Sequence, residues 1–149
     1  MTQEPRIVCY TIHHPFDTAL RMLKTALLRE GLRIPCEISP STRLRTELGV
    51  GLKESTILYV DSPILLLEAT VFTVGGGLYI PEPIALSDSG HKESKVVVRS
   101  IKPYLDDSLS SGARRAILQL HERILQAIQS IGQREPVFPL SRDHVTVPA

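Results

Sequence analysis

The chain has 149 residues, a size typical of one ordinary domain that buries roughly two thirds of the surface its unfolded form exposes. Its 17 Lys and Arg residues nearly balance 16 Asp and Glu residues, so the composition does not imply a strongly basic surface for nucleic acid or membrane. No apolar run approaches the ~18 residues of a spanning helix, and the first residues lack the pattern of a secretory signal. The sequence therefore predicts a cytoplasmic protein with no nucleic-acid or membrane partner.

The first part of the chain predicts two strands separated by a helix. Apolar residues alternate over 6–13 and again over 32–39, which is typical of strands. Between them, apolar residues recur at helical spacing over 16–30. Cys9 and Cys36 occupy core-facing positions in these strands, so we expect free, buried thiols without a catalytic role.

A short helix, a third strand and an apolar helix are expected next. The short helix spans 41–49 with Ser41 as its cap, and the strand spans 55–61. Ser62 followed by proline is typical of a helix start, which predicts a helix over 63–74. Because this helix is apolar nearly all round, it needs cover on every side, either from its own core or from a second subunit.

The second half of the chain predicts a hairpin and a long helix. Strands are expected over 78–86 and 94–101, joined by a longer polar loop. The long helix, over 111–131, carries its main apolar stripe and a second apolar shoulder formed by Leu118 and Leu125. We expect this shoulder to be a candidate subunit contact.

These elements predict an α+β fold, a two-layer sandwich in which helices pack on one mixed or mostly antiparallel sheet of about five strands. We expect a single domain over 1–132, with its core over 7–101 and the C-terminal helix over 111–131. The proline-containing tail, 133–149, is expected to be either a flexible end or an arm packed on this chain or a neighbour.

Three consecutive glycines at 75–77 raise the question of a ligand cradle. A phosphate-binding loop follows a strand and precedes a helix, whereas these glycines follow a helix and precede a strand. We therefore interpret them as a helix stop with a turn that requires positive φ. Close approach of the backbone to a ligand, with Gly77 as the candidate, is the alternative.

Several stretches together indicate a family. Ser62-Pro63, then Gly77, then "LYIP" at 78–81, together with "FDTALRMLKTALLREGL" and "LGVGLKESTILYV", keep one order of turn and apolar residues. Over about residues 7–101 the chain resembles the bacterial and archaeal family called domain of unknown function 302 (DUF302). The resemblance implies a compact α+β fold, commonly a homodimer, and no established activity.

The chain departs from that family pattern at two places. Asp61-Ser62-Pro63 stands where many relatives carry Cys-Asn-Pro, and Pro81-Glu82 stands where they carry Pro-Cys. Any redox or metal chemistry of such thiols is therefore excluded for this chain. Asp61 and Glu82 would instead offer oxygen ligands, which suit Mg²⁺ or Ca²⁺.

The densest group of possible ligands is His13-His14-Pro15-Phe16-Asp17. Neighbouring strand residues point to opposite faces, so only His14 and Asp17 are expected to converge, which is too few for zinc. The other histidines are interpreted as solvated or edge residues: His91, His121 and His144.

Two functions remain open. The first is a non-enzymatic homodimeric module that binds a small ligand or a protein partner, with no cofactor and no metal. The second is a metal-dependent or acid–base enzyme that uses Asp61, Glu82 and the His13/His14 cluster. No recognisable catalytic motif favours the second. The candidate ligand-binding residues are His14, Asp17, Asp61, Gly77 and Glu82.

Overall fold

Six strands form one antiparallel sheet in the order β2-β3-β4-β5-β1-β6 in the computed structural model, which describes residues 6–71 and 73–136. Every strand pair in the sheet is antiparallel. The predicted α+β class is therefore confirmed. The strands are β1 (Ile7–Ile12), β2 (Arg33–Ile38), β3 (Ser55–Asp61), β4 (Glu82–Gly90), β5 (Glu93–Arg99) and β6 (Gln133–Arg134).

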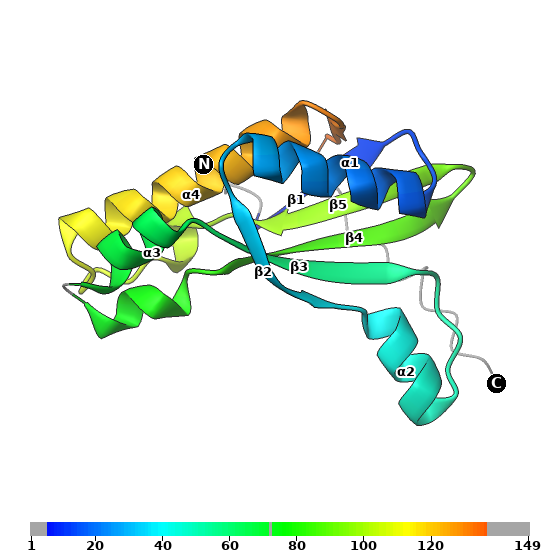
Figure 1. The fold of residues 1–149 in the computed structure, drawn as a ribbon, viewed down its shortest axis with the longest axis horizontal. Helices are drawn as coiled ribbons and strands as arrows, with labels where there is room; N and C mark the ends of the chain where they lie inside the picture. Colours follow the sequence, from blue (N-terminus) through cyan, green and yellow to red (C-terminus); the bar gives the residue numbers. More distant parts are fainter. Residues whose placement is uncertain (1–5, 72, 137–149) are drawn as a thin grey trace.

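Three of the four α-helices, α1, α3 and α4, pack on one face of this sheet, while α2 projects from the other side near one end (Figure 1). None of the helices in the described ranges is long and apolar enough to cross a membrane. The helical segments are α1 (Phe16–Arg29), α2 (Pro40–Leu48), α3 (Pro63–Thr70), α4 (Ser111–Gln129) and the short 3₁₀ turns η1 (Val74–Leu78) and η2 (Lys102–Tyr104).

The core lies between the sheet and these three helices. Strand residues that face the helices, such as Leu58, Ile84 and Val96, are almost completely buried, and their neighbours in sequence are only partly buried. The expected stripe of α4 faces them, with Ile117, Leu120 and Ile124 among its buried members. The alternating apolar residues of the strands and the apolar stripe of the helix therefore pack against each other in one core, as their spacings in the sequence indicate.

The hairpin between β4 and β5 is tighter than predicted. The expected longer loop is wrong, because β4 continues to Gly90 and only His91 and Lys92 lie in the turn. Both residues have positive φ, 54° and 58°, as the central pair of a type I′ turn requires. The polar residues 87–90 suggest a loop in the sequence. In the structure they belong to β4, which pairs with β5 as far as the turn.

Two local expectations in the first half are also corrected. The cap of α2 is Ser39 rather than Ser41: the Ser39 hydroxyl accepts a hydrogen bond of 3.3 Å from the backbone N–H of Thr42. Both cysteines are free, but Cys9 is only partly buried and Cys36 is exposed. Their register with β5 and β3 places them on the sheet face away from the helices, so their predicted burial in the core is wrong.

The glycines at 75–77 do not form the turn that the sequence analysis expects. α3 ends at Thr70, and the glycines lie in η1, with none of them at positive φ. Gly76 is buried against α3, where an added Cβ would lie 1.8 Å from the carbonyl oxygen of Ala69. The glycine is therefore needed for close approach of two backbone segments of the same chain.

The start of the expected C-terminal tail forms a sixth strand. β6 pairs with β1 through Tyr10↔Arg134 and Thr11↔Gln133. The next residue, Glu135, accepts hydrogen bonds from the Thr11 hydroxyl and from the Lys95 ammonium group. This segment is thus an arm packed on its own chain, while the rest of the tail, 137–149, lies outside the described residues.

The substitution Gly76→Ala tests the close approach of η1 to α3. We expect it to lower the free energy of unfolding by about 3 kcal/mol, because the new methyl group overlaps a backbone oxygen that cannot move aside. The control is Gly77→Ala, where the added Cβ meets only the Thr70 methyl group, at 3.6 Å. Urea unfolding of both variants measures the difference, and equal loss in the two would contradict this account.

Candidate functional site

The residues that the sequence analysis selects lie at two opposite ends of the sheet. His13 and His14 follow β1, whose last residue, Ile12, pairs with Ser94 of β5. Ser94 pairs in turn with Asp88, and Asp88 lies six residues along β4 from Glu82. At ~3.3 Å per residue, roughly 20 Å separates the two ends. The histidine cluster and Glu82 therefore do not share a substrate or a metal ion.

The histidine end of the sheet is a solvent-exposed surface. His13 Nδ1 lies 3.1 Å from a carboxylate oxygen of Glu93, with side chains 59% and 40% exposed. The carbonyl of His14 accepts a hydrogen bond from the Ser94 hydroxyl, while the His14 and Asp17 side chains are exposed. Across residues 6–71 and 73–136, no group of three or more His, Cys, Asp or Glu residues is arranged to hold a metal ion.

At the other end, Glu82 is a buried carboxylate with a specific partner. It begins β4 on the helix-facing side and is 1% exposed. His121 of α4 lies directly over it, with 2.6 Å between Nδ1 and the carboxylate oxygen Oε1. The imidazole side chain is itself only 15% exposed. This short hydrogen bond joins the sheet to the long helix and satisfies a group that is costly to bury alone.

The sequence analysis interprets His121 as an edge histidine, so its contact with Glu82 was missed. A signal exists in the local pattern: Glu82 stands in phase with Ile84 and Leu86, which face the core. A glutamate in that phase needs a hydrogen-bond donor from a packed helix. His121, beside the apolar stripe of the last helix, is such a donor, but only the tertiary structure brings the two together.

Asp61 is a neighbour of Glu82 in the sheet but points away from it. Val60 is the register partner of Glu82, so strand alternation directs the next residue, Asp61, toward the opposite face. Burial raises the pKa of the Asp61 carboxyl, and the guanidinium of Arg33, its register partner on β2, partly offsets this effect. The two carboxylates that the sequence suggests as oxygen ligands therefore do not face a common ion.

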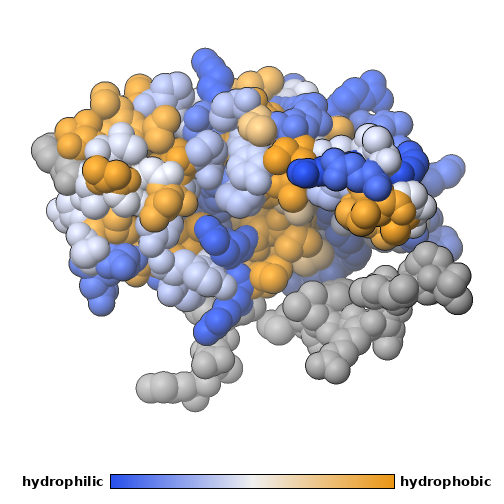
Figure 2. Space-filling model, turned by 90° about the horizontal axis from the view of Figure 1, so that it is seen from below, coloured by the Kyte–Doolittle hydropathy of each residue, from blue (hydrophilic) through white to orange (hydrophobic). Residues whose placement is uncertain are grey.

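Several exposed apolar side chains lie on α3 and η1, and we call this region the α3–η1 surface. Ile64, Leu67 and Val71 follow the i, i+3, i+7 spacing of one helix face and are 69%, 61% and 55% exposed. Val74 and Leu78 of η1 extend it, at 93% and 84% exposure. Figure 2 shows several hydrophobic residues, with more polar ones between them, at this end of the molecule, the left end in Figures 1 and 2.

The opposite side of α3 is covered, since Leu65 and Ala69 are buried and the helix packs against α4. The apolar helix therefore finds cover from its own chain on one side only. Leu118 and Leu125, which the sequence analysis expects as a candidate subunit contact, are partly buried against the core of this chain. The largest exposed apolar side chains of this region thus belong to α3 and η1.

The substitution His121→Ala tests the buried pair. It leaves the Glu82 carboxylate buried without its donor, and we expect the free energy of unfolding to fall by about 3 kcal/mol. A second change, Glu82→Leu in the same background, should recover part of this loss because it removes the unpaired charge. Urea unfolding checks both, with His13→Ala at the exposed pair as a control that changes stability by about 0.5 kcal/mol or less.

The substitution Asp61→Asn tests the burial of that carboxyl. Because its pKa is raised in the folded protein, the folded state binds more protons at this carboxyl than the unfolded state as the pH falls toward that pKa, and the destabilising contribution of Asp61 to the wild-type protein is relieved. We expect Asp61→Asn to raise the melting temperature at neutral pH and to lose this advantage on acidification. Thermal unfolding from pH 7 to pH 3 measures this difference in melting temperature, with Asp107→Asn, at an exposed carboxyl, as the control. A gain in melting temperature that persists at acidic pH would contradict the raised pKa of Asp61.

Comparison with known proteins agrees with this architecture. The family model described as "Domain of unknown function DUF302" matches residues 8–131. The crystal structure of an uncharacterized conserved DUF302 protein from Bacillus stearothermophilus superposes with a TM-score of 0.71 at 12% sequence identity, covering 85% of this chain and 98% of that one. A search of curated proteins finds no match. The chain therefore belongs to the DUF302 family.

Proposed function

We propose that this protein is a non-enzymatic module that acts as a homodimer, with the α3–η1 surface as the contact between two copies. The observation that carries the proposal is the exposure of five large apolar side chains on two consecutive segments, at 55% to 93%. Exposed apolar side chains gathered in one region of a protein often mark an interaction surface. Covering them on a second copy removes this apolar area from water without any rearrangement of the fold.

The charge of this surface favours a second copy as its occupant. A twofold contact places the same residues of two chains against each other, so charged residues at its centre would face like charges. The segment 63–78 carries a single charged residue, Glu68, which is exposed and lies beside the apolar stripe. A surface with one charged residue beside its apolar side chains is compatible with itself where the twofold axis keeps the two copies of that residue apart.

The placement of the candidate acid–base groups supports a non-enzymatic function. His13 and His14 lie at the end of the sheet opposite Glu82, and Asp61 points to the other face. The hydrogen bond between Glu82 and His121 is explained by the packing of α4 on the sheet. The alternative of a metal-dependent or acid–base enzyme that uses Asp61, Glu82 and the His13/His14 cluster therefore has less support than the module.

Two further properties belong to this proposal. Both cysteines are free, which fits the reducing cytoplasm that the sequence analysis predicts. The near balance of acidic and basic residues fits a partner recognised through apolar contact rather than through long-range charge.

The substitution Leu67→Glu tests the dimer. It places a carboxylate at the centre of the α3–η1 surface, where the twofold contact would bury two such charges. We expect the dimer dissociation constant to rise more than about tenfold, which corresponds to ~1.4 kcal/mol. Sedimentation velocity from low to high micromolar concentration measures the constant for the wild-type and variant proteins.

The matched control is Leu28→Glu, which introduces the same charge on α1 at a leucine that is 52% exposed. It should leave the dissociation constant unchanged. A wild-type protein that stays monomeric at high micromolar concentration would overturn the proposal. An equal effect of the two variants would show that the contact lies elsewhere.

A further inference from the structure

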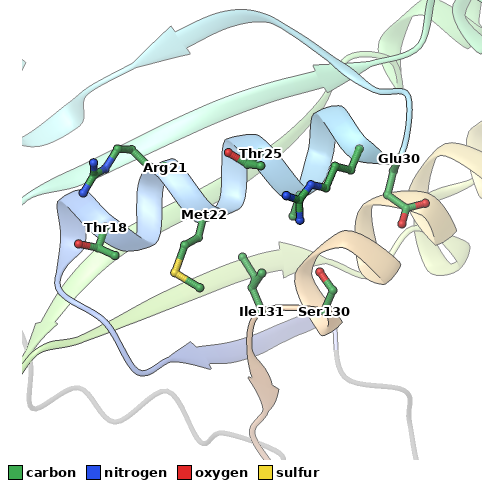
Figure 3. A pocket seen from close by; sticks show the side chains of 9 residues that line it. Thr18, Arg21, Met22, Thr25, Glu30, Ser130 and Ile131 are labelled. Carbon is green, nitrogen blue, oxygen red and sulfur yellow. The ribbon is translucent and has the colours of Figure 1, made fainter.

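A groove with a cavity volume of about 570 Å³ runs between α1 and the C-terminal end of α4, away from the α3–η1 surface. Figure 3 shows Met22 of α1 extending toward the space beside Ile131, which follows α4, with Thr18 farther along the same helix. Its lining residues are Thr18, Arg21, Met22, Thr25, Ala26, Arg29, Glu30, Ser130 and Ile131.

The α1 side of the groove consists of two parallel rows. Residues four apart lie next to each other on a helix surface, so Thr18, Met22 and Ala26 form one row. Met22 is partly buried and Ala26 is buried, and together with Ile131 across the groove they make a mainly apolar floor. A methionine in such a floor adapts its shape to an apolar group placed on it.

The second row is Arg21, Thr25 and Arg29, all exposed along the outer edge of the floor. Each arginine is four residues from Thr25, about 6 Å along the helix axis, so both guanidinium groups can reach a group held above the threonine. The row thus offers two charged donors and one hydroxyl within a short distance. This is a donor set that suits a carboxylate or phosphate.

Neither arginine has a partner within the part of the chain that the structure describes. Arg21 and Arg29 form no ion pair or side-chain hydrogen bond there, as is also true of other exposed arginines such as Arg45 and Arg115, so what sets the two apart is their spacing beside the groove. The Thr25 hydroxyl is equally free of a partner in these ranges. Glu30 lies at the far end of the groove, beyond Arg29, and its carboxylate pairs with neither arginine.

We infer that this groove binds an amphipathic organic anion. Its carboxylate or phosphate lies over Thr25 between Arg21 and Arg29, and its apolar body lies on Met22, Ala26 and Ile131. Glu30 limits the ligand to one anionic group at the arginine row, because a second anionic group near it would be repelled. This binding site goes beyond the proposed homodimer, since it lies on elements that the α3–η1 surface does not use.

The experiment is a titration of the ¹⁵N-labelled full chain with octanoate, followed by amide chemical shifts. We expect shifts concentrated at the lining residues of α1 and at Ile131. The double substitution Arg21→Gln and Arg29→Gln should weaken binding about tenfold, because the charged donors are lost while the floor remains. Arg115→Gln, an exposed arginine of α4 outside the groove, is the matched control and should not change the affinity.

Two further probes separate the parts of the inference. The neutral 1-octanol should bind the wild-type protein more weakly than octanoate does. To the double variant, which lacks the charged donors, octanol and octanoate should bind with equal affinity. Vesicles of phosphatidylglycerol distinguish a free ligand from a lipid headgroup: cosedimentation that the double variant loses would assign the same anion site to lipid, and its absence would assign it to a free molecule.

Three results would overturn the inference. The first is that octanoate shifts no groove residue up to millimolar concentration, the second is that the double variant and Arg115→Gln bind it equally, and the third is that octanol binds the wild-type protein as tightly as octanoate. Because both arginines are exposed, the variants should unfold at the wild-type temperature, which separates a lost site from a lost fold. The oligomeric state, measured in the same samples, keeps this result independent of the proposed dimer.

Discussion

The hydrogen bond between Glu82 and His121 is the specific polar contact that ties the long helix to the sheet, on top of the apolar packing between them. A carboxylate that is 1% exposed is strongly destabilising without a donor, so the pair favours the packing of α4 in which His121 meets Glu82, in addition to the buried apolar stripe of the helix. α3 packs against α4, and η1 packs against α3 at Gly76, where no Cβ fits. The exposed apolar side chains of α3 and η1 are thus presented by a chain of contacts that begins at one buried pair.

The same one-sided layering explains why the two proposed surfaces are separate. α1, α3 and α4 cover one face of the sheet, so each contributes one side to the core and leaves the other to solvent (Figure 1). On α3 the outer side is apolar, whereas on α1 it carries the arginine row beside the groove. A partner copy on α3 and a small anion on α1 would therefore contact different helices.

Periodicity predicted most elements of this fold, because strands and helices that share one core repeat their apolar residues at different spacings. It failed where the answer depended on residues distant in sequence. His91 and Lys92 adopt positive φ without glycine, since the pairing of β4 with β5 extends to them. The pattern around Cys36 did not indicate which face of the strand meets the helices. His121 was missed for the same reason, because nothing in α4 itself indicates that Glu82 lies beneath it.

The family comparison limits what the fold can say about function. A chain with 12% identity reaches a TM-score of 0.71, so the architecture needs the apolar pattern and few particular residues. Function must then come from groups that the architecture does not require. His121 provides the hydrogen-bond partner that the buried Glu82 carboxylate requires, so the packing of α4 on the sheet explains this pair. Exposed apolar residues on α3, and an arginine pair placed beside a groove on α1, have no such explanation within the described chain, and both are therefore better evidence of binding than the buried pair.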